Sequence, residues 1–141
     1  MQAGPVITIA AAAFLDRDGR TLLVRKRGSP FFMQPGGKID AGETPREALV
    51  RELREELDLE VDAGDFAYAG LFSEEAANEP DTMVKAHVFV SFRPVEARAL
   101  AEIEEARWFP LQGEPDAAFA RLTENHILPL ARRALAEGRY R

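Results

Sequence analysis

The stretch Gly37–Leu59, GKIDAGETPREALVRELREELDL, is a turn that leads into a helix rich in carboxylates. Thr44, Pro45 and Glu47 occupy the positions at which a helix start favours an N-cap, a proline in the first turn and the acid of a capping box. The pattern therefore predicts a helix that begins at Thr44.

Two faces of this helix differ in chemistry. At about 100° per residue, its aliphatic side chains fall on one stripe, which we expect to be buried. The stripe consists of Leu49, Val50, Leu53 and Leu57. Glu52, Glu55 and Glu56 share the neighbouring face because they are spaced at i, i+3 and i+4. Three acids are thus predicted to cluster at the edge of a core.

A solvated surface helix is the alternative interpretation. Glu47, Arg51 and Glu55 form an i, i+4, i+8 ladder of alternating charge, which is typical of an exposed helix face. Against it, Glu52 and Glu56 have like charge at i, i+4, which is unfavourable unless a cation lies between them.

The stretch resembles the Nudix box, the signature of enzymes that cleave nucleoside diphosphates linked to another group, and it is most similar to the MutT-like type. The resemblance is carried by Gly37, Glu43, Arg51, Glu52, Leu53, Glu55, Glu56 and Leu59. Asp58 stands where the family has a glycine that ends the helix in a left-handed conformation. Because Asp tolerates that conformation, we expect an adjusted C-cap at Asp58.

The resemblance also implies site residues. It implies that Glu52, Glu55, Glu56 and the carbonyl of Gly37 bind Mg²⁺ or Mn²⁺. It implies that Glu52 is the metal ligand that in some members is also the base, and that Arg51 orients it and pairs with Glu43. Gly42, Glu43 and Asp58 are structural positions of the motif. A further glutamate that binds metal or acts as the base is expected at Glu102, with Glu104 and Glu105 as alternatives.

Composition favours one globular domain over residues 1–141, with 46% hydrophobic and 30% charged residues. The longest apolar candidate, Val6–Leu15, is too short to cross a membrane. We therefore expect a cytoplasmic protein without a membrane partner.

Cysteine content and charge narrow the chemistry. The chain has no cysteine, so a metal must be held by oxygen or histidine ligands, and a cysteine-dependent Nudix-like isopentenyl diphosphate isomerase is excluded. The net charge of −6 argues against nucleic acid as the main partner. A small-molecule nucleotide is the expected partner, and a homodimer is left open.

The first half of the chain supplies candidate phosphate contacts. Val6–Leu15 and Thr21–Val24 are expected to form a β-hairpin. Arg25 and Arg27, in the basic run that leaves the second strand, are candidates to bind a substrate phosphate, and a charged strand end is the alternative. Lys38 is a further phosphate candidate.

Two positions before the glycines bear on base binding. Phe32 could stack on a nucleobase, although packing in the core is the commoner fate of an aromatic and is favoured. Gln34 stands where relatives of this family have an aliphatic residue, so it departs from the family's base-binding pattern.

The second half is expected to alternate strands and loops before it ends in a helix. Strands are expected at 66–72, 83–92 and 108–109, a specificity loop at 73–82, a charged loop at 93–107, a short helical segment at 115–122 and a helix at 125–137. Asn125 could contact a purine, and a helix cap is the alternative.

These elements predict an α/β fold in which a mixed sheet lies between helices, and the resemblance implies the Nudix α/β/α sandwich. The expected activity is metal-dependent hydrolysis of a diphosphate bridge by a MutT-like (deoxy)nucleoside triphosphate pyrophosphohydrolase. Hydrolysis of ADP-ribose, a dinucleoside polyphosphate or a nucleotide sugar is one alternative. A nucleotide-binding module without turnover and a structural domain with a solvated acidic helix are the others.

Overall fold

The computed structural model describes residues 4–138. Its strands are β1 (Val6–Phe14), β2 (Arg20–Lys26), β3 (Phe31–Met33), β4 (Gly36–Lys38), β5 (Ala67–Glu75), β6 (Met83–Ser91), β7 (Ile103–Pro110) and β8 (Ala118–Phe119). Its helices are α1 (Pro45–Leu57), the 3₁₀ turn η1 (Ala63–Asp65), the π turn η2 (Thr123–Ile127) and α2 (Leu128–Glu137).

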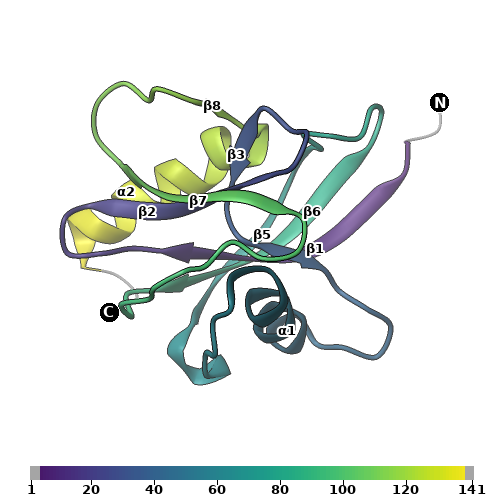
Figure 1. The fold of residues 1–141 in the computed structure, drawn as a ribbon, viewed down its shortest axis with the longest axis horizontal. Coiled ribbons are helices and arrows are strands. Elements are labelled where there is room, and N and C mark those ends of the chain that lie inside the picture. The colour runs from purple at the N-terminus through teal and green to yellow at the C-terminus, as the bar shows by residue number, and fades with distance from the viewer. Residues whose placement is uncertain (1–3, 139–141) are drawn as a thin grey trace.

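The strands form two mixed sheets, in the orders β4-β1-β6-β5 and β7-β2-β3-β8. In the first sheet β1 runs parallel to β6, and in the second β3 runs parallel to β8. Figure 1 shows α1 below the strands and α2 behind them. The predicted α/β/α sandwich is therefore confirmed, with the strands divided between two sheets.

The predicted hairpin of the first two strands is wrong. β1 and β2 are consecutive but belong to different sheets, and the pairing between them in residues 4–138 is limited to the bridge of Leu15 with Thr21 and the bond from the Thr21 hydroxyl to the carbonyl of Phe14. Both edges of β1 are occupied, by β4 on one side and β6 on the other. The turn between the strands is real, since the Asp16 carboxylate accepts bonds from the backbone N–H groups of Asp18 and Arg20 at 3.0 and 2.8 Å.

The start and end of α1 follow the sequence prediction. The backbone N–H of Glu47 donates to Thr44 Oγ1 at 3.1 Å and the backbone N–H of Thr44 donates to Glu47 Oε1 at 2.8 Å, which completes the capping box. Asp58 caps the other end in the left-handed conformation, with φ of 55°. The helix that carries the predicted site is therefore fixed at both ends by local interactions.

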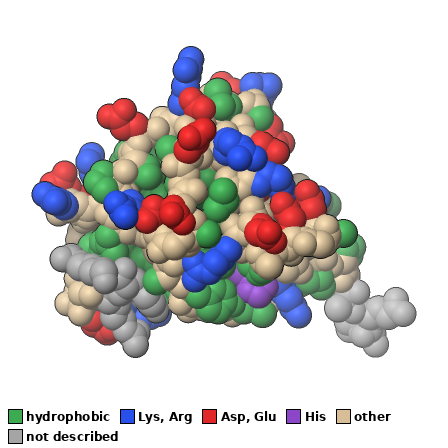
Figure 2. Space-filling view, turned by 90° about the horizontal axis from the view of Figure 1, so that it is seen from below, with side chains coloured by type: hydrophobic (Ala, Val, Ile, Leu, Met, Phe, Trp, Pro, Cys, Tyr) green, Lys and Arg blue, Asp and Glu red, His purple; other side chains and the backbone are tan. Residues whose placement is uncertain are grey.

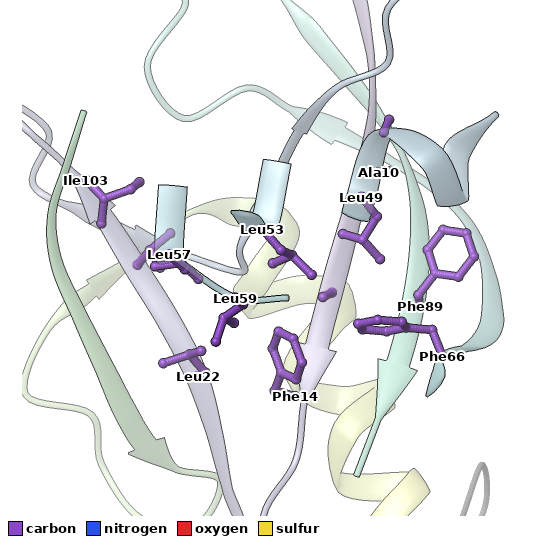
Figure 3. Close-up of a cluster of buried hydrophobic side chains, with 13 residues drawn as sticks. Ala10, Phe14, Leu22, Leu49, Leu53, Leu57, Leu59, Phe66, Phe89 and Ile103 are labelled. Atoms are coloured by element: carbon purple, nitrogen blue, oxygen red, sulfur yellow. The ribbon is translucent and has the colours of Figure 1, made fainter. Parts of the chain in front are cut away.

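The core has two main parts, one on each face of the first sheet. Side chains of β1 and of Leu15, which follows it, alternate between them: Ala10, Ala12 and Phe14 pack with α1, whereas Ala13 and Leu15 pack with α2. On the α1 side, Leu49, Leu53 and Leu57 point from the helix towards the strands (Figure 3). Val50, predicted in the same stripe, is only partly buried.

The predicted loop over 93–107 ends earlier than expected, because β7 begins at Ile103. β7 pairs antiparallel with β2, from Arg20 opposite Pro110 to Lys26 opposite Ile103. The charged residues at the start of β7 predicted a loop, but pairing with the distant strand β2 makes them part of a sheet. The short helix predicted over 115–122 is also wrong: this stretch contains β8, which pairs with β3.

The C-terminal helix has an irregular start. The π turn η2 runs directly into α2, and the Leu128 backbone N–H donates to the carbonyl of Thr123, five residues back. Pro129 follows at the start of α2 and has no N–H to continue the ordinary ladder. The helix predicted from Asn125 is thus confirmed, but it starts with a widened turn.

Candidate active site

Two glycines allow close contacts at β4. A Cβ on Gly36 would lie 2.1 Å from the carbonyl oxygen of Ala10, and one on Gly37 would lie 2.3 Å from the Cδ of Glu52. Gly36 therefore lets β4 approach β1, and Gly37 lets the Glu52 carboxylate rest against the backbone. The structure thus brings two predicted metal ligands, Gly37 and Glu52, into contact.

Arg51 organises the acids around it. Its Nε and Nη2 donate to the two carboxylate oxygens of Glu43 at 2.7 and 2.9 Å. Its Nη1 donates to Glu52 at 2.9 Å and to Glu55 at 3.3 Å, and its Nη2 donates to the carbonyl of Lys38 at 3.0 Å. The hydrogen bonds from Arg51 lower the pKa of Glu43 to about 2. The bonds to Glu43 raise the pKa of Arg51 further above its usual range. The predicted roles of Arg51 and Glu43 fit this geometry.

Glu56 lies one helical turn after Glu52, and only 7% of its surface is exposed. Burial raises the pKa of its carboxyl, and the charges of Glu52 and Glu102 raise it further, whereas Lys26 opposes the shift. Lys26 Nζ lies 3.6 Å from Glu102 Oε1. Four side chains therefore gather at one place: Glu52 and Glu56 of α1, Lys26 of β2, and Glu102, which directly precedes β7.

The fit of a metal ion can be judged from these donors. In residues 4–138, no group of three Asp, Glu or His side chains is assembled as a metal cluster. Glu55 is turned to Arg51 and its side chain is 54% exposed, so it stands apart from Glu56. The carboxylates of Glu52, which rests against Gly37, and of Glu56, one turn later, are nevertheless the kind of oxygen ligands that Mg²⁺ and Mn²⁺ take.

A pocket continues from these residues around β4. Its charged lining residues include Lys26, Lys38 and Glu56, together with Gly36 and Gly37. Its apolar lining residues include Ile7, Ile9, Val84 and Leu122. Gln34 and the 75–79 segment also line the pocket, as do Val24, Met33 and Ala120. A lining that combines charged and apolar side chains suits a ligand with a phosphate part and a ring part.

The structure brings Lys26, rather than Arg25 or Arg27, to the pocket. Arg25 donates to the carbonyl of Ser29 and lies 3.5 Å from Glu105, while Arg27 lies 3.4 Å from Glu104. Strand alternation gives the reason, because neighbours of Lys26 along β2 point to the opposite face. Val24, two residues before Lys26, also lines the pocket. This two-residue spacing, which puts both side chains on one face of β2, was the signal that sequence reasoning missed.

Phe32 does not contact the pocket, which corrects its assignment as a substrate-binding residue. It is 3% exposed and packs with Leu23 and Phe109 in a small core on the second sheet. Its ring meets Phe109 edge to face, with 4.9 Å between centroids. The packing alternative is therefore confirmed.

Three other predicted residues are placed as follows. Gly42 has φ of 83° in the turn before α1, which fits a structural position. Glu102 lies at the cluster, whereas its alternatives pair with Arg25 and Arg27. Asn125 donates to Glu74 at 2.9 Å and is within the π turn, so the helix-cap alternative is wrong. Its purine contact stays a prediction.

The surface around α1 is mixed in charge. Figure 2 shows the face that lies below in Figure 1, where α1 is found, with acidic and basic side chains interspersed over it. In residues 4–138, no helix is long and apolar enough to cross a membrane.

Comparison with known proteins matches residues 5–130 to the NUDIX domain. The chain belongs to the Nudix hydrolase family. It is 32% identical over 119 residues to an ADP-ribose pyrophosphatase of Methanocaldococcus jannaschii, covering 79% of this chain and 66% of that relative. It is 37% identical over 106 residues to a putative 8-oxo-dGTP diphosphatase 2 of Mycobacterium tuberculosis, covering 65% of this chain and 74% of the relative.

The fold comparison agrees with the family. A MutT Nudix hydrolase from Burkholderia pseudomallei superposes with a TM-score of 0.69 at 25% identity, covering 91% of this chain and 96% of the other. The Nudix α/β/α sandwich and the Nudix box at 37–59 are thus shown. Against the Methanocaldococcus relative, the chain spans just under two thirds of the relative's length.

Proposed function

We propose that the chain is a metal-dependent hydrolase that cleaves the diphosphate linkage of a nucleoside diphosphate derivative, as a MutT-like (deoxy)nucleoside triphosphate pyrophosphohydrolase. One observation carries the proposal. Glu52 rests against Gly37, and the buried Glu56, which interacts with the charges of Glu52 and Lys26, lines one pocket with Gly37, Lys26 and several apolar side chains. A solvated surface helix would not bury Glu56 next to like charges.

Each residue has a chemical role in this proposal. Lys26 and Lys38 attract the substrate phosphates. Glu52, with one oxygen held by Arg51 at 2.9 Å, accepts the proton of the attacking water. Glu52, Glu56 and the Gly37 carbonyl would hold Mg²⁺ or Mn²⁺, and Glu102 would add a ligand or act as the base. A bound ion would neutralise phosphate charge and lower the pKa of a coordinated water.

Hydrolysis of ADP-ribose is a second candidate. It is favoured by the relative that matches over 79% of this chain, which is named an ADP-ribose pyrophosphatase. The same carboxylates would serve, because ADP-ribose has the same diphosphate bridge. A nucleotide-binding module without turnover is a third candidate, and it would not need the base.

A panel of nucleotides with Mg²⁺ or Mn²⁺ separates these candidates. A triphosphate pyrophosphohydrolase releases pyrophosphate and a nucleoside monophosphate, whereas cleavage of ADP-ribose gives AMP and ribose 5-phosphate. A binding module without turnover releases none of these products. Chelation of the metal with EDTA is expected to abolish turnover.

Glu52→Gln tests the base directly. We expect kcat to fall by about 10²–10⁴, as is typical when a general base is removed. Glu60→Gln, which removes the same charge from an exposed position after α1, is the matched control and is expected to keep its activity. A loss of less than about tenfold in Glu52→Gln would remove Glu52 from the role of base.

We further propose that the chain acts as a single domain in the cytoplasm on small-molecule nucleotides, without nucleic acid as a substrate. A homodimer stays open, and sedimentation of the purified chain would decide it.

A further inference from the structure

Among the residues that line the pocket, Gln34 is a nearly buried polar side chain that no step of the hydrolysis uses. Gln34 is only 6% exposed, and it lines this pocket just before Pro35 and Gly36. Its carboxamide offers one acceptor oxygen and two N–H donors. Which of these faces the ligand is decided by what holds the other.

Thr123 fixes the orientation of that carboxamide. The Thr123 hydroxyl donates to Gln34 Oε1 at 2.5 Å. Thr123 is fully buried, in the π turn that precedes α2, so its hydroxyl is held by the helix. The oxygen of Gln34 is thereby turned towards α2, and the –NH₂ group is turned away from it.

The nitrogen of Gln34 is open to the pocket. In the described part of the chain, Nε2 has no protein partner, because the Gln34 side chain bonds only through Oε1. In residues 4–138, Arg107 Nε is the one fully buried side-chain nitrogen or oxygen without a hydrogen-bond partner. Gln34 Nε2, which also lacks a partner, is therefore not fully buried. Because Gln34 is nearly buried and lines the pocket, the exposed part of Nε2 faces the pocket.

The surroundings identify which part of a nucleotide would reach this donor. Leu122 directly precedes Thr123 and lines the pocket together with Ile7, Ile9 and Val84. Met33, the neighbour of Gln34 along the chain, lines it too, and a phosphate is not expected beside Met33 and Leu122. The flat apolar part of the substrate is its base, so Gln34 faces the base.

The open side of the pocket is also fixed. The Ser29 hydroxyl donates to Asn78 Oδ1 at 2.7 Å, which ties the 75–79 segment to the turn before β3. The backbone N–H of Phe31 in turn donates to Ser29 Oγ at 3.1 Å. The base would therefore enter a bordered pocket in which the donor of Gln34 is already oriented.

We propose that Gln34, oriented by Thr123, selects nucleotides whose base presents a carbonyl oxygen rather than an exocyclic amine at the edge facing the pocket. A carbonyl accepts the N–H of Gln34, whereas an amine at the same position sets donor against donor. Oxo-purines, uracil and thymine are then favoured over adenine. The inference rests on the proposed function, and it favours the triphosphate activity over cleavage of ADP-ribose.

Two substrate pairs that differ mainly in one group test the proposal. ITP and ATP differ at position 6 of the purine, and UTP and CTP at position 4 of the pyrimidine. In the wild-type protein, kcat/KM is expected to be about tenfold or more higher for the carbonyl member of at least one pair. Ratios within about threefold of one in both pairs would overturn the proposal.

Variants of Gln34 and Thr123 assign the preference to this contact. Gln34→Glu replaces the donor by an acceptor of the same shape and is expected to turn the ratio towards the amine member. Gln34→Leu is expected to bring the ratio near one. Thr123→Val, which frees the carboxamide to rotate, should weaken the preference, and the matched Thr123→Ser should keep it. An unchanged ratio in both Gln34 variants, with folding verified by circular dichroism, contradicts the proposal.

Failure of the proposed function is distinguishable from failure of this inference. If no nucleotide is hydrolysed, calorimetric binding of IMP against AMP and of UMP against CMP takes the place of kcat/KM. Tighter binding of a carbonyl member, lost in Gln34→Leu, supports the role of Gln34 without turnover. Equal binding within a pair, or no binding of any of the four, overturns it.

Discussion

Asp58 is the position at which this chain departs from the Nudix box, and its backbone is left-handed with φ of 55°. A non-glycine residue pays a steric cost there that glycine does not. We expect Asp58→Gly to stabilise the fold by about 0.5–1 kcal/mol, which raises Tm by roughly 2–4 °C. Thermal unfolding measures this, and Asp58→Asn, which tolerates the same conformation, serves as control. An identical Tm for wild type and Asp58→Gly would show that the cap imposes no such cost.

The pair of Arg51 and Glu43 makes stability depend on pH. The pKa of Glu43 falls from 4.5 to about 2 because Arg51 donates two hydrogen bonds to its carboxylate. A lowered pKa in the folded state gives a contribution that is complete above about pH 4.5 and is lost as the pH falls towards 2. The difference in free energy of unfolding between wild type and Glu43→Gln should therefore be constant near neutral pH and shrink below pH 4.5. Denaturant unfolding at several pH values checks this, and a difference that grows on acidification contradicts it.

At the scale of the element, the two glycines of β4 have different roles: Gly36 is structural and Gly37 is functional. The Cβ of Gly36→Ala would meet the backbone of β1, and φ of 148° at Gly36 is itself unfavourable for alanine, so we expect a loss of more than about 2 kcal/mol of stability. The Cβ of Gly37→Ala would meet only the end of the flexible Glu52 side chain. We expect that variant to stay folded but to lose activity at least tenfold, because Glu52 must move.

Unfolding and turnover of the two alanine variants check this pair. Equal stability of both, or full activity of Gly37→Ala, would contradict the division.

Elements formed by local interactions were predictable, and those formed by distant pairing were not. Thr44, Glu47 and Asp58 fix the ends of α1 through neighbours within a few residues, so sequence alone located the helix. The hairpin of β1 and β2 was wrong because both edges of β1 are taken by strands far along the chain. For the site, alternation along β2 puts Lys26 on the same face as Val24, but which face of β2 lines the pocket is decided by the pairing of β2 with distant β7.

On the scale of the whole molecule, the two sheets explain what the acids of α1 face. α1 packs on β1 of the first sheet, and its core also includes Leu22 and Ile103 of the second. Glu56 is therefore buried at the point where the two sheets and the helix meet, a contact that the amphipathic pattern of α1 alone could not reveal. The predicted acidic cluster was correct in its residues, but its burial is a property of the complete fold.

The hydrogen bond between Gln34 and Thr123 joins residues that are 89 positions apart. Glu52 and Glu56 lie within one contiguous stretch, whereas the apolar lining of the pocket comes from dispersed segments that include β1, β6 and the residues just before the C-terminal helix. These two parts of the protein can therefore diverge separately in evolution. Substitutions at a few dispersed positions would give descendants with new substrates, while the inherited hydrolytic machinery stays as it is.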